Sequence, residues 1–409
     1  MTLDTSPDAV ADERGVAAAV RRRIEAIRQG DVGSLPVVVG LILITVFFAT
    51  KNSNFVSAQN FNNLIVQMAA VTTIAYGVVF VLLLGEIDLS IGFVSGVSGV
   101  VVAELQLPDG HFEVKGVAAI VIAMAVCALI GAFQGSFVAY IGVPSFVVTL
   151  AGLLAWQGVI NKAIGIQGVI VIQDNTINNV ANYYFSHMWG WIIAAVASTV
   201  YAAGTLGGVV GRRRHGIRTD NFALVLAKVA AIVAAAFGVA AYSNHDVDRG
   251  IPFAGVLIIV LLVVLTFVAK RTTFGRHVYA VGGSAEAARR AGINVPRIRL
   301  YVFMISGAMA ALGGVIFAGR LSSVDLNAGG GTILLDAIAA AVIGGTSLFG
   351  GRGEVKSALF GALIIATIAN GIDLVGYSSG VKFITTGAIL LAAVTLNTIS
   401  RRRLAASGR

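Results

Sequence analysis

Two acidic residues, Glu86 and Asp88, stand within an otherwise apolar part of the chain and are its most unusual chemical feature. A charged side chain at membrane depth costs at least about 2.5–3.5 kcal/mol, so it has to face protein or water. One interpretation is that Asp88 holds an interrupted helix through backbone N–H groups or lines a polar path. The other places both residues in a turn at the headgroup level, where ionised carboxylates cost little. The apolar surroundings favour the first interpretation.

The segment around these acids is rich in glycine, and a similar segment occurs late in the chain. The first is Gly85-Glu86-Ile87-Asp88-Leu89-Ser90-Ile91-Gly92, and the second is Gly344-Gly345-Thr346-Ser347-Leu348-Phe349-Gly350-Gly351-Arg352-Gly353. Interrupted hydrophobic segments in matching places of two halves indicate an internal repeat with broken helices near a transport path. Because the similarity between the halves is faint, two unrelated tight turns remain an alternative.

Three further polar residues, Asp336, Asn370 and Asp373, lie in or beside the last apolar segments. Asn and Asp at such positions hydrogen-bond between helices, and this is the role that we expect, with contact to a transported solute as the alternative. The candidate residues of a translocation path or broken helix are therefore Glu86, Asp88, Ser90, Asn370 and Asp373.

Residues for catalysis or metal binding do not form a recognisable pattern. The histidines are scattered without an i, i+4 pair, and the single Cys127 lies in an apolar segment, which excludes an intrachain disulfide and a cysteine metal site. A phosphate-binding loop needs Lys and Ser or Thr where Gly351 and Arg352 follow Gly350. We therefore expect no catalytic residue, no metal site and no cofactor on this chain, and no ATP binding.

The composition identifies the kind of protein that must position these residues. Of 409 residues, 57% are hydrophobic and 12% are charged, whereas soluble domains average about 45–50% and 25%. The net charge of +9 comes from Lys and Arg in short stretches between apolar segments, as the positive-inside rule describes for cytoplasmic loops. This pattern excludes a soluble globular protein and gives no support to nucleic-acid binding. The 49 glycines fit closely packed membrane helices or a simple bias towards small residues.

Apolar segments long enough to be helices recur along the whole chain. They are Leu35–Thr50, Phe61–Leu84, Leu89–Leu105, Gly116–Tyr140, Pro144–Lys162, His187–Val210, Asn221–Tyr242, Ile251–Ala269, Leu300–Ala318, Thr332–Leu348, Val355–Val375 and Val381–Ile399. They predict an all-α transmembrane bundle over residues 35–400, with about ten to twelve spans. The tails, 1–34 and 401–409, and the loop 270–299 are basic and are expected in the cytoplasm, whereas Gly165–Ser186 is expected to be an outer polar loop.

The loop 270–299 contains a signal for a short helix outside the membrane. Ser284 can cap it, Glu286 suits its first turn, and Gly292 suits its end, before Pro296. We expect about two turns of helix. Its small apolar face would fit a groove of another protein and would consist of Ala287, Ala288 and Ala291.

The pattern Glu286-Ala287-Ala288-x-x-x-Gly292 resembles the "EAA" coupling loop of bacterial ATP-binding-cassette (ABC) importer permeases. The region 270–403, together with Gly85–Gly92, is similar to the ribose/xylose-type sugar permeases of that group, and the similarity runs from Phe61 to Arg403. The chain length is nearer to the xylose type. The resemblance implies that Glu286, Ala287, Ala288 and Gly292 dock onto a separate ATPase subunit, although the pattern departs from the general one after Gly292.

This resemblance also implies a function for the whole chain. It would be the non-catalytic permease subunit of an importer for a monosaccharide, a pentose such as xylose, in the bacterial cell membrane with both termini inside. Its partners would be an ATPase that carries ATP and Mg²⁺, an extracytoplasmic sugar-binding protein, membrane lipid and a second permease copy in a homodimer. An ion-coupled secondary transporter is the alternative, for which Glu86, Asp88, Asp336 and Asp373 are the only deep carboxylates. An enzyme acting on lipid would need a polar catalytic cluster, which the sequence lacks.

Overall fold

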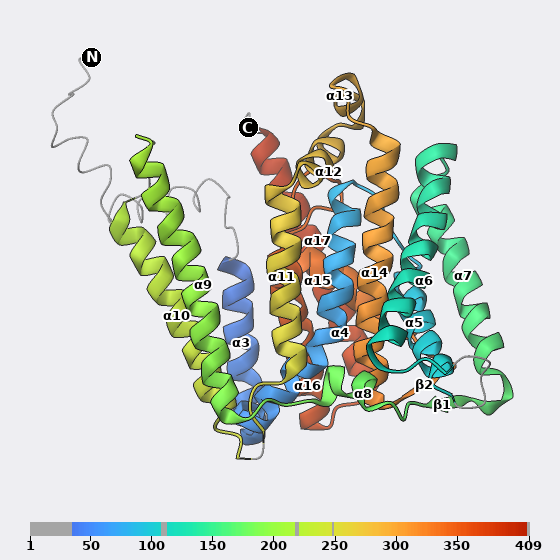
Figure 1. Ribbon diagram of the computed structural model, residues 1–409, viewed down its shortest axis with the longest axis horizontal. Helices are drawn as coiled ribbons and strands as arrows, with labels where there is room; N and C mark the ends of the chain where they lie inside the picture. The colour runs from blue at the N-terminus through green and yellow to red at the C-terminus, as the bar shows by residue number, and fades with distance from the viewer. Residues whose placement is uncertain (1–34, 108–112, 217–220, 248, 407–409) are drawn as a thin grey trace. The chain divides into compact units, whose positions relative to one another are not determined.

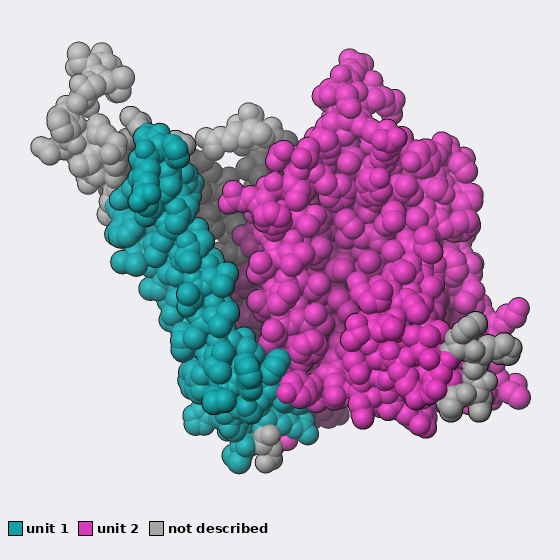
Figure 2. Space-filling model, in the orientation of Figure 1, with its two compact units in different colours: residues 1–33, 184–251, 398–409 teal, residues 34–183, 252–397 magenta. Residues whose placement is uncertain are grey.

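The computed structural model describes residues 35–107, 113–216, 221–247 and 249–406, and these are almost entirely helical (Figure 1). The chain divides into two compact units, which Figure 2 shows in different colours. The larger unit contains residues 34–183 and 252–397, and the smaller one contains residues 184–251 together with 1–33 and 398–409. The expected N-terminal tail lies outside the described residues.

All the predicted apolar segments fall on helices, so the prediction of an all-α membrane bundle is confirmed. The helices that carry them are α3 (Leu35–Lys51), α4 (Ala58–Leu83), α5 (Ile91–Leu105), α6 (Gly116–Ser136) with a π-turn (Phe137–Ile141), α7 (Ser145–Ile164), α9 (His187–Arg214), α10 (Phe222–Ser243), α11 (Phe253–Arg271), α14 (Val295–Leu321), α15 (Ile333–Ile343), α16 (Val355–Val375) and α17 (Ser379–Ala406). Within the described part of the chain, eight helices are long and apolar enough to span a membrane, and α5 and α15 are shorter apolar helices. Helix α17 continues into the expected C-terminal tail, whose last residues, 407–409, are outside the described ranges.

Helices α4 and α14 form the centre of the larger unit. Helix α14 packs against α4, α5 and α6, while α16 packs against α3, α4 and α15 (Figure 1). Lipid gives helices no hydrophobic reason to associate, so close packing through small residues has to hold them together. A Cβ atom added at Gly77 of α4 would lie 3.0 Å from the Cβ of Met309 on α14. Here glycine permits the contact, which supports the close-packing interpretation of its abundance.

The segment Gly165–Ser186, predicted as a polar loop, has more structure than expected. It contains a 3-10 turn (Gly165–Gln167), the strand β1 (Val169–Val171) and the helix α8 (Asn175–Asn182), and β1 pairs antiparallel with β2 (Ser323–Asp325). Gln106 at the end of α5 holds it in place. Its Nε2 donates to the carbonyl oxygen of Val171 (2.8 Å), and its Oε1 accepts from the backbone N–H of Asp174 (2.9 Å).

The smaller unit is a hairpin in which α9 and α10 pack against each other. Two backbone hydrogen bonds join the chain where it enters and leaves this hairpin. The N–H of Phe185 donates to the carbonyl oxygen of Ile251 (3.0 Å), and the N–H of Phe253 donates to that of Tyr183 (2.9 Å). The chain therefore leaves the larger unit and returns to it at neighbouring positions.

Candidate functional site

The connection between α4 and α5 holds Asp88, whose side chain is buried, with only 8% of the residue exposed. Its Oδ1 accepts hydrogen bonds from the backbone N–H (2.9 Å) and the hydroxyl (2.7 Å) of Ser90. Its Oδ2 accepts from the hydroxyl of Ser306 on α14 (3.4 Å). Backbone donors at the start of a helix have no partner within it. Asp88 therefore supplies an acceptor at the beginning of α5.

Helices α6 and α7 supply further polar contacts to this connection. The hydroxyl of Ser90 lies 3.0 Å from Oε1 of Gln134 on α6. On α7, the hydroxyl of Ser145 accepts from the N–H of Ile87 (3.2 Å), and that of Thr149 donates to the carbonyl oxygen of Ile87 (3.3 Å). The connection is thus held by side chains from three helices, α6, α7 and α14.

Glu86 forms an ion pair with Arg299, in the first turns of α14, with 3.1 Å between Oε1 and Nε. The side chains are 14% and 29% exposed, respectively. Arg299 is a site residue that the sequence analysis did not single out. A signal existed, because a largely buried carboxylate requires a partner and Arg299 is the last basic residue of the loop 270–299.

The predicted short helix is present as α13 (Ala285–Arg290), which Figure 1 shows beyond the ends of α11 and α14. The hydroxyl of Ser284 accepts from the N–H of Ala287 (3.2 Å), as an N-cap does. Gly292 has φ +82° and follows the last turn, as a C-terminal glycine does. Glu286 pairs with Arg289 (3.5 Å) and Arg290 (3.1 Å) of its own helix, so its carboxylate is held locally.

Two details of α13 and α14 differ from the prediction. Ala288 is buried, with 4% exposure, so the exposed apolar face of α13 is reduced to Ala287 and Ala291. Helix α14 begins at Val295, not near Leu300, because Pro296 occupies its first turn, where the missing N–H costs no hydrogen bond.

A second helix, α12 (Thr273–Gly283), precedes α13 and was not predicted. Thr272 caps it by accepting from the N–H of Gly275 (3.1 Å). We call α12, α13 and the residues up to Asn294 the coupling segment, after the permease coupling loop that its sequence resembles.

Helix α12 packs onto the end of α4 and onto the second glycine-rich segment. The hydroxyl of Tyr279 donates to the carbonyl oxygen of Gly353 (2.8 Å), in the second glycine-rich segment. The N–H of Gly351 in the same segment donates to the carbonyl oxygen of Leu83, at the end of α4 (2.8 Å). The two glycine-rich segments that the sequence singles out therefore meet beneath α12.

Glu354, which precedes α16, lies between two lysines. Lys270, at the end of α11, pairs with its Oε1, and Lys356 lies 2.5 Å from its Oε2. Partial burial alone would raise the pKa of Glu354, but the hydrogen bonds and charges of the two lysines outweigh it and hold the pKa below its usual value. This cluster joins α11 to α16 beside α12.

Asn370 and Asp373 lie far from the other candidate residues. Asn370 exchanges hydrogen bonds with Asn60 near the start of α4, whereas Glu86 and Asp88 follow the end of α4. A helix of 26 residues is about 39 Å long. Asp373 is 62% exposed on its side chain and pairs with Lys382 at 3.5 Å. The five candidates therefore form two separate groups.

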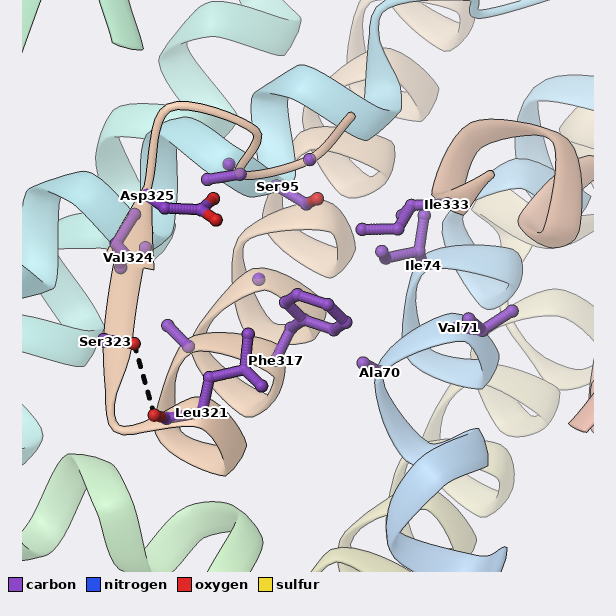
Figure 3. Close-up of a pocket in the computed structure, with 16 residues that line it drawn as sticks. Ala70, Val71, Ile74, Ser95, Phe317, Leu321, Ser323, Val324, Asp325 and Ile333 are labelled. Atoms are coloured by element: carbon purple, nitrogen blue, oxygen red, sulfur yellow. Dashed lines mark hydrogen bonds between the residues drawn. The ribbon is translucent and has the colours of Figure 1, made fainter. Parts of the chain in front are cut away.

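The structure has a small cavity between α4, α5, α14 and β2 that the sequence did not predict (Figure 3). Most of its lining is apolar, as at Ile74 and Phe317, and Ser95 and Asp325 supply polar groups. Its volume of about 30 Å³ has room for one or two water molecules.

The apolar helices, the interrupted connection and the projecting coupling segment define a multi-pass membrane permease. The chain belongs to the family described as branched-chain amino acid transport system / permease component, which it matches over residues 60–394. It is 37% identical to the xylose transport system permease protein XylH of Escherichia coli (strain K12), over 90% of this chain and 92% of that protein.

Two other relatives extend the comparison. The xylose transport system permease protein XylH of Haemophilus influenzae (strain Rd) is 35% identical, over 90% of this chain and 96% of its own length. The ribose import permease protein RbsC of Bacillus subtilis (strain 168) is 29% identical, over 88% and 90%. No solved structure shows a significant match to the chain.

Proposed function

We propose that this chain is the membrane-spanning subunit of an ABC importer for a monosaccharide, with xylose as its substrate. The observation that carries the proposal is the 37% identity to a xylose transport system permease over 90% of the chain. A separate ATPase subunit would bind ATP and Mg²⁺, and an extracytoplasmic protein would deliver the sugar. A second copy of this chain would complete the path. Both termini and α13 would lie in the cytoplasm, an orientation that the basic residues of these segments support.

In this proposal, α13 is the contact with the ATPase. Ala287 and Ala291 offer a small apolar surface, while Ala288 packs against this chain and holds α13 in place. The ion pairs of Glu286 with Arg289 and Arg290 stiffen the helix. Closure of the ATPase would push on α13, and alternating access of the membrane path would follow. The path itself would bind sugar weakly, since the delivering protein supplies most of the affinity.

Reconstitution in liposomes tests the proposed function. Purified chain alone should take up no labelled xylose, even under a proton or sodium gradient. The same chain reconstituted with its ATPase and sugar-binding protein should concentrate xylose when ATP is supplied, and excess unlabelled xylose should compete better than ribose. Gradient-driven uptake by the chain alone would contradict the proposal and favour the secondary transporter. Stronger competition by ribose would contradict only the choice of sugar.

A further inference from the structure

Helix α12 of the coupling segment and helix α14, which directly follows that segment, contact the same short connection in the membrane domain. In α12, Gly282 lies against Leu83, the last residue of α4. In α14, Arg299 pairs with Glu86. The connection Leu83–Asp88 therefore contacts both the coupling segment and the helix that continues from it.

The contact at Gly282 depends on the absence of a side chain. A Cβ atom added there would overlap the carbonyl oxygen of Leu83 and would lie 2.8 Å from the backbone nitrogen of Gly351. That carbonyl oxygen also accepts the hydrogen bond from Gly351. At the next residue, Gly283, an added Cβ atom would meet nothing within 4 Å. The requirement for glycine is thus specific to the position that faces α4.

The contact at Arg299 is electrostatic and partly shielded from water. Removing one partner of such a pair leaves the other charge uncompensated, which costs more than the loss of an exposed pair. Glu86 is two residues before Asp88, which supplies the acceptor at the start of α5 and also contacts α14 through Ser306. A movement of Glu86 would therefore pass along the backbone to Asp88, and from Asp88 to α5 through the hydrogen bonds with Ser90.

We propose that the connection Leu83–Asp88 receives the movement of the coupling segment and transmits it to α5, with Gly282 and Arg299 as the positioning residues. This inference rests on the proposed function. Helix α12 presses on the end of α4 through Gly282, and α14 moves the Glu86 side of the connection through Arg299. The two contacts come from different helices, so a movement of the coupling segment that also shifts the start of α14 acts on the connection at two points.

The first experiment compares Gly282→Ala with Gly283→Ala in the complete transporter, reconstituted with its ATPase and sugar-binding protein. The readout is labelled xylose taken up per ATP hydrolysed, because a change in the amount of folded protein alters both quantities together. We expect Gly282→Ala to lower this ratio about tenfold, within the usual range of coupling between sites, while Gly283→Ala leaves it unchanged. Equal ratios in the two assembled variants would overturn the role of Gly282.

A second pair of variants keeps the inference testable if Gly282→Ala fails to assemble. Arg299→Gln and Glu86→Gln should each lower the uptake per ATP, and the double variant should lower it little further, because both remove one interaction. Arg297→Gln is the matched control, since Arg297 is exposed on the same turn of α14. Unchanged ratios in Arg299→Gln and Glu86→Gln would overturn the inference. If the unmodified transporter hydrolyses ATP without taking up xylose, the proposed function itself is wrong.

Discussion

Asn60 and Asn370, 310 residues apart in the sequence, hydrogen-bond to each other in both directions. The Nδ2 of Asn60 donates to Oδ1 of Asn370 (2.8 Å), and the Nδ2 of Asn370 donates to Oδ1 of Asn60 (2.9 Å). Both residues are buried, at 8% and 3% exposure. This pair joins the start of α4 to the end of α16 and accounts for a polar residue in an apolar helix, since amides bond between helices in membranes.

Asn370→Leu should lower the free energy of unfolding by about 1–3 kcal/mol, because Asn60 is left with unsatisfied buried groups. Thermal unfolding of the purified chain in detergent measures the effect. The double variant Asn60→Leu/Asn370→Leu should recover part of the loss, since it removes both polar partners. A single variant as stable as the unmodified chain would show that the pair contributes nothing.

Asp88→Ala should lower thermal stability, because it removes the acceptor for the backbone N–H of Ser90 and leaves that buried donor unsatisfied at a cost of about 1–3 kcal/mol, whereas the hydroxyl of Ser90 can still donate to Gln134. Asp88→Asn should be nearly silent, since its oxygen can still accept from Ser90 and its NH₂ group can donate to the hydroxyl of Ser306. Stability, assembly with the ATPase and xylose uptake should be measured for both variants. Two stable variants that assemble and lose uptake would instead place Asp88 on the sugar path.

Gly292→Val should leave the membrane helices intact and reduce xylose uptake per ATP, because a branched side chain disfavours φ near +82° by roughly 1–2 kcal/mol and would deform the end of α13. Gly376→Val is the matched control. Gly376 ends α16 with φ +80° and also has open space around it. Normal coupling in Gly292→Val, at normal expression, would remove Gly292 from the mechanism.

The pH dependence of stability should report the ion pairs of Glu354. Because the folded state holds the pKa of Glu354 below its ordinary value of 4.5, its contribution is present above that value and is lost as the pH falls through the folded pKa. Glu354→Gln should remove this part of the acid destabilisation, by no more than about 1 kcal/mol, since the side chain is 34% exposed. Thermal unfolding between about pH 7 and 3 measures it. Identical acid profiles for the variant and the unmodified chain would contradict the assignment.

The sequence predicted the helices of this fold well because a membrane span needs a long apolar segment and little else. Helix α12 was not predicted. Gly282 and Gly283 stand at its end, and only the contact with Leu83 explains why the first of these two positions is glycine. The prediction also placed the start of α14 too late, because the apolar segment begins only at Leu300, after Arg297 and Arg299, whereas the helix begins at Val295 with Pro296 in its first turn. The internal repeat stays a prediction.

The sequence also identified the local parts of the candidate site more readily than its distant contacts. Ser284 begins α13 and Gly292 ends it, through contacts within a few residues, and residue spacing in the sequence can indicate such local contacts. Arg299 and Ser306 reach Glu86 and Asp88 across more than 200 positions, and nothing in the spacing marks such a pair. The burial of Ala288 was also missed, because a helix of six residues is too short to show the periodicity that distinguishes a buried face from an exposed one.

The hydrogen bonds at the base of the α9–α10 hairpin hold its two ends together, so the hairpin could be deleted without separating the chain on either side of it. Residues Tyr183 and Phe253 are already joined by a hydrogen bond, so a linker of about two glycines could replace residues 184–251. Both helices of the hairpin are long and apolar enough to span a membrane, so its removal would take away an even number of crossings and keep the direction of every later helix. Removal of the hairpin would therefore leave the coupling segment on the same side of the membrane.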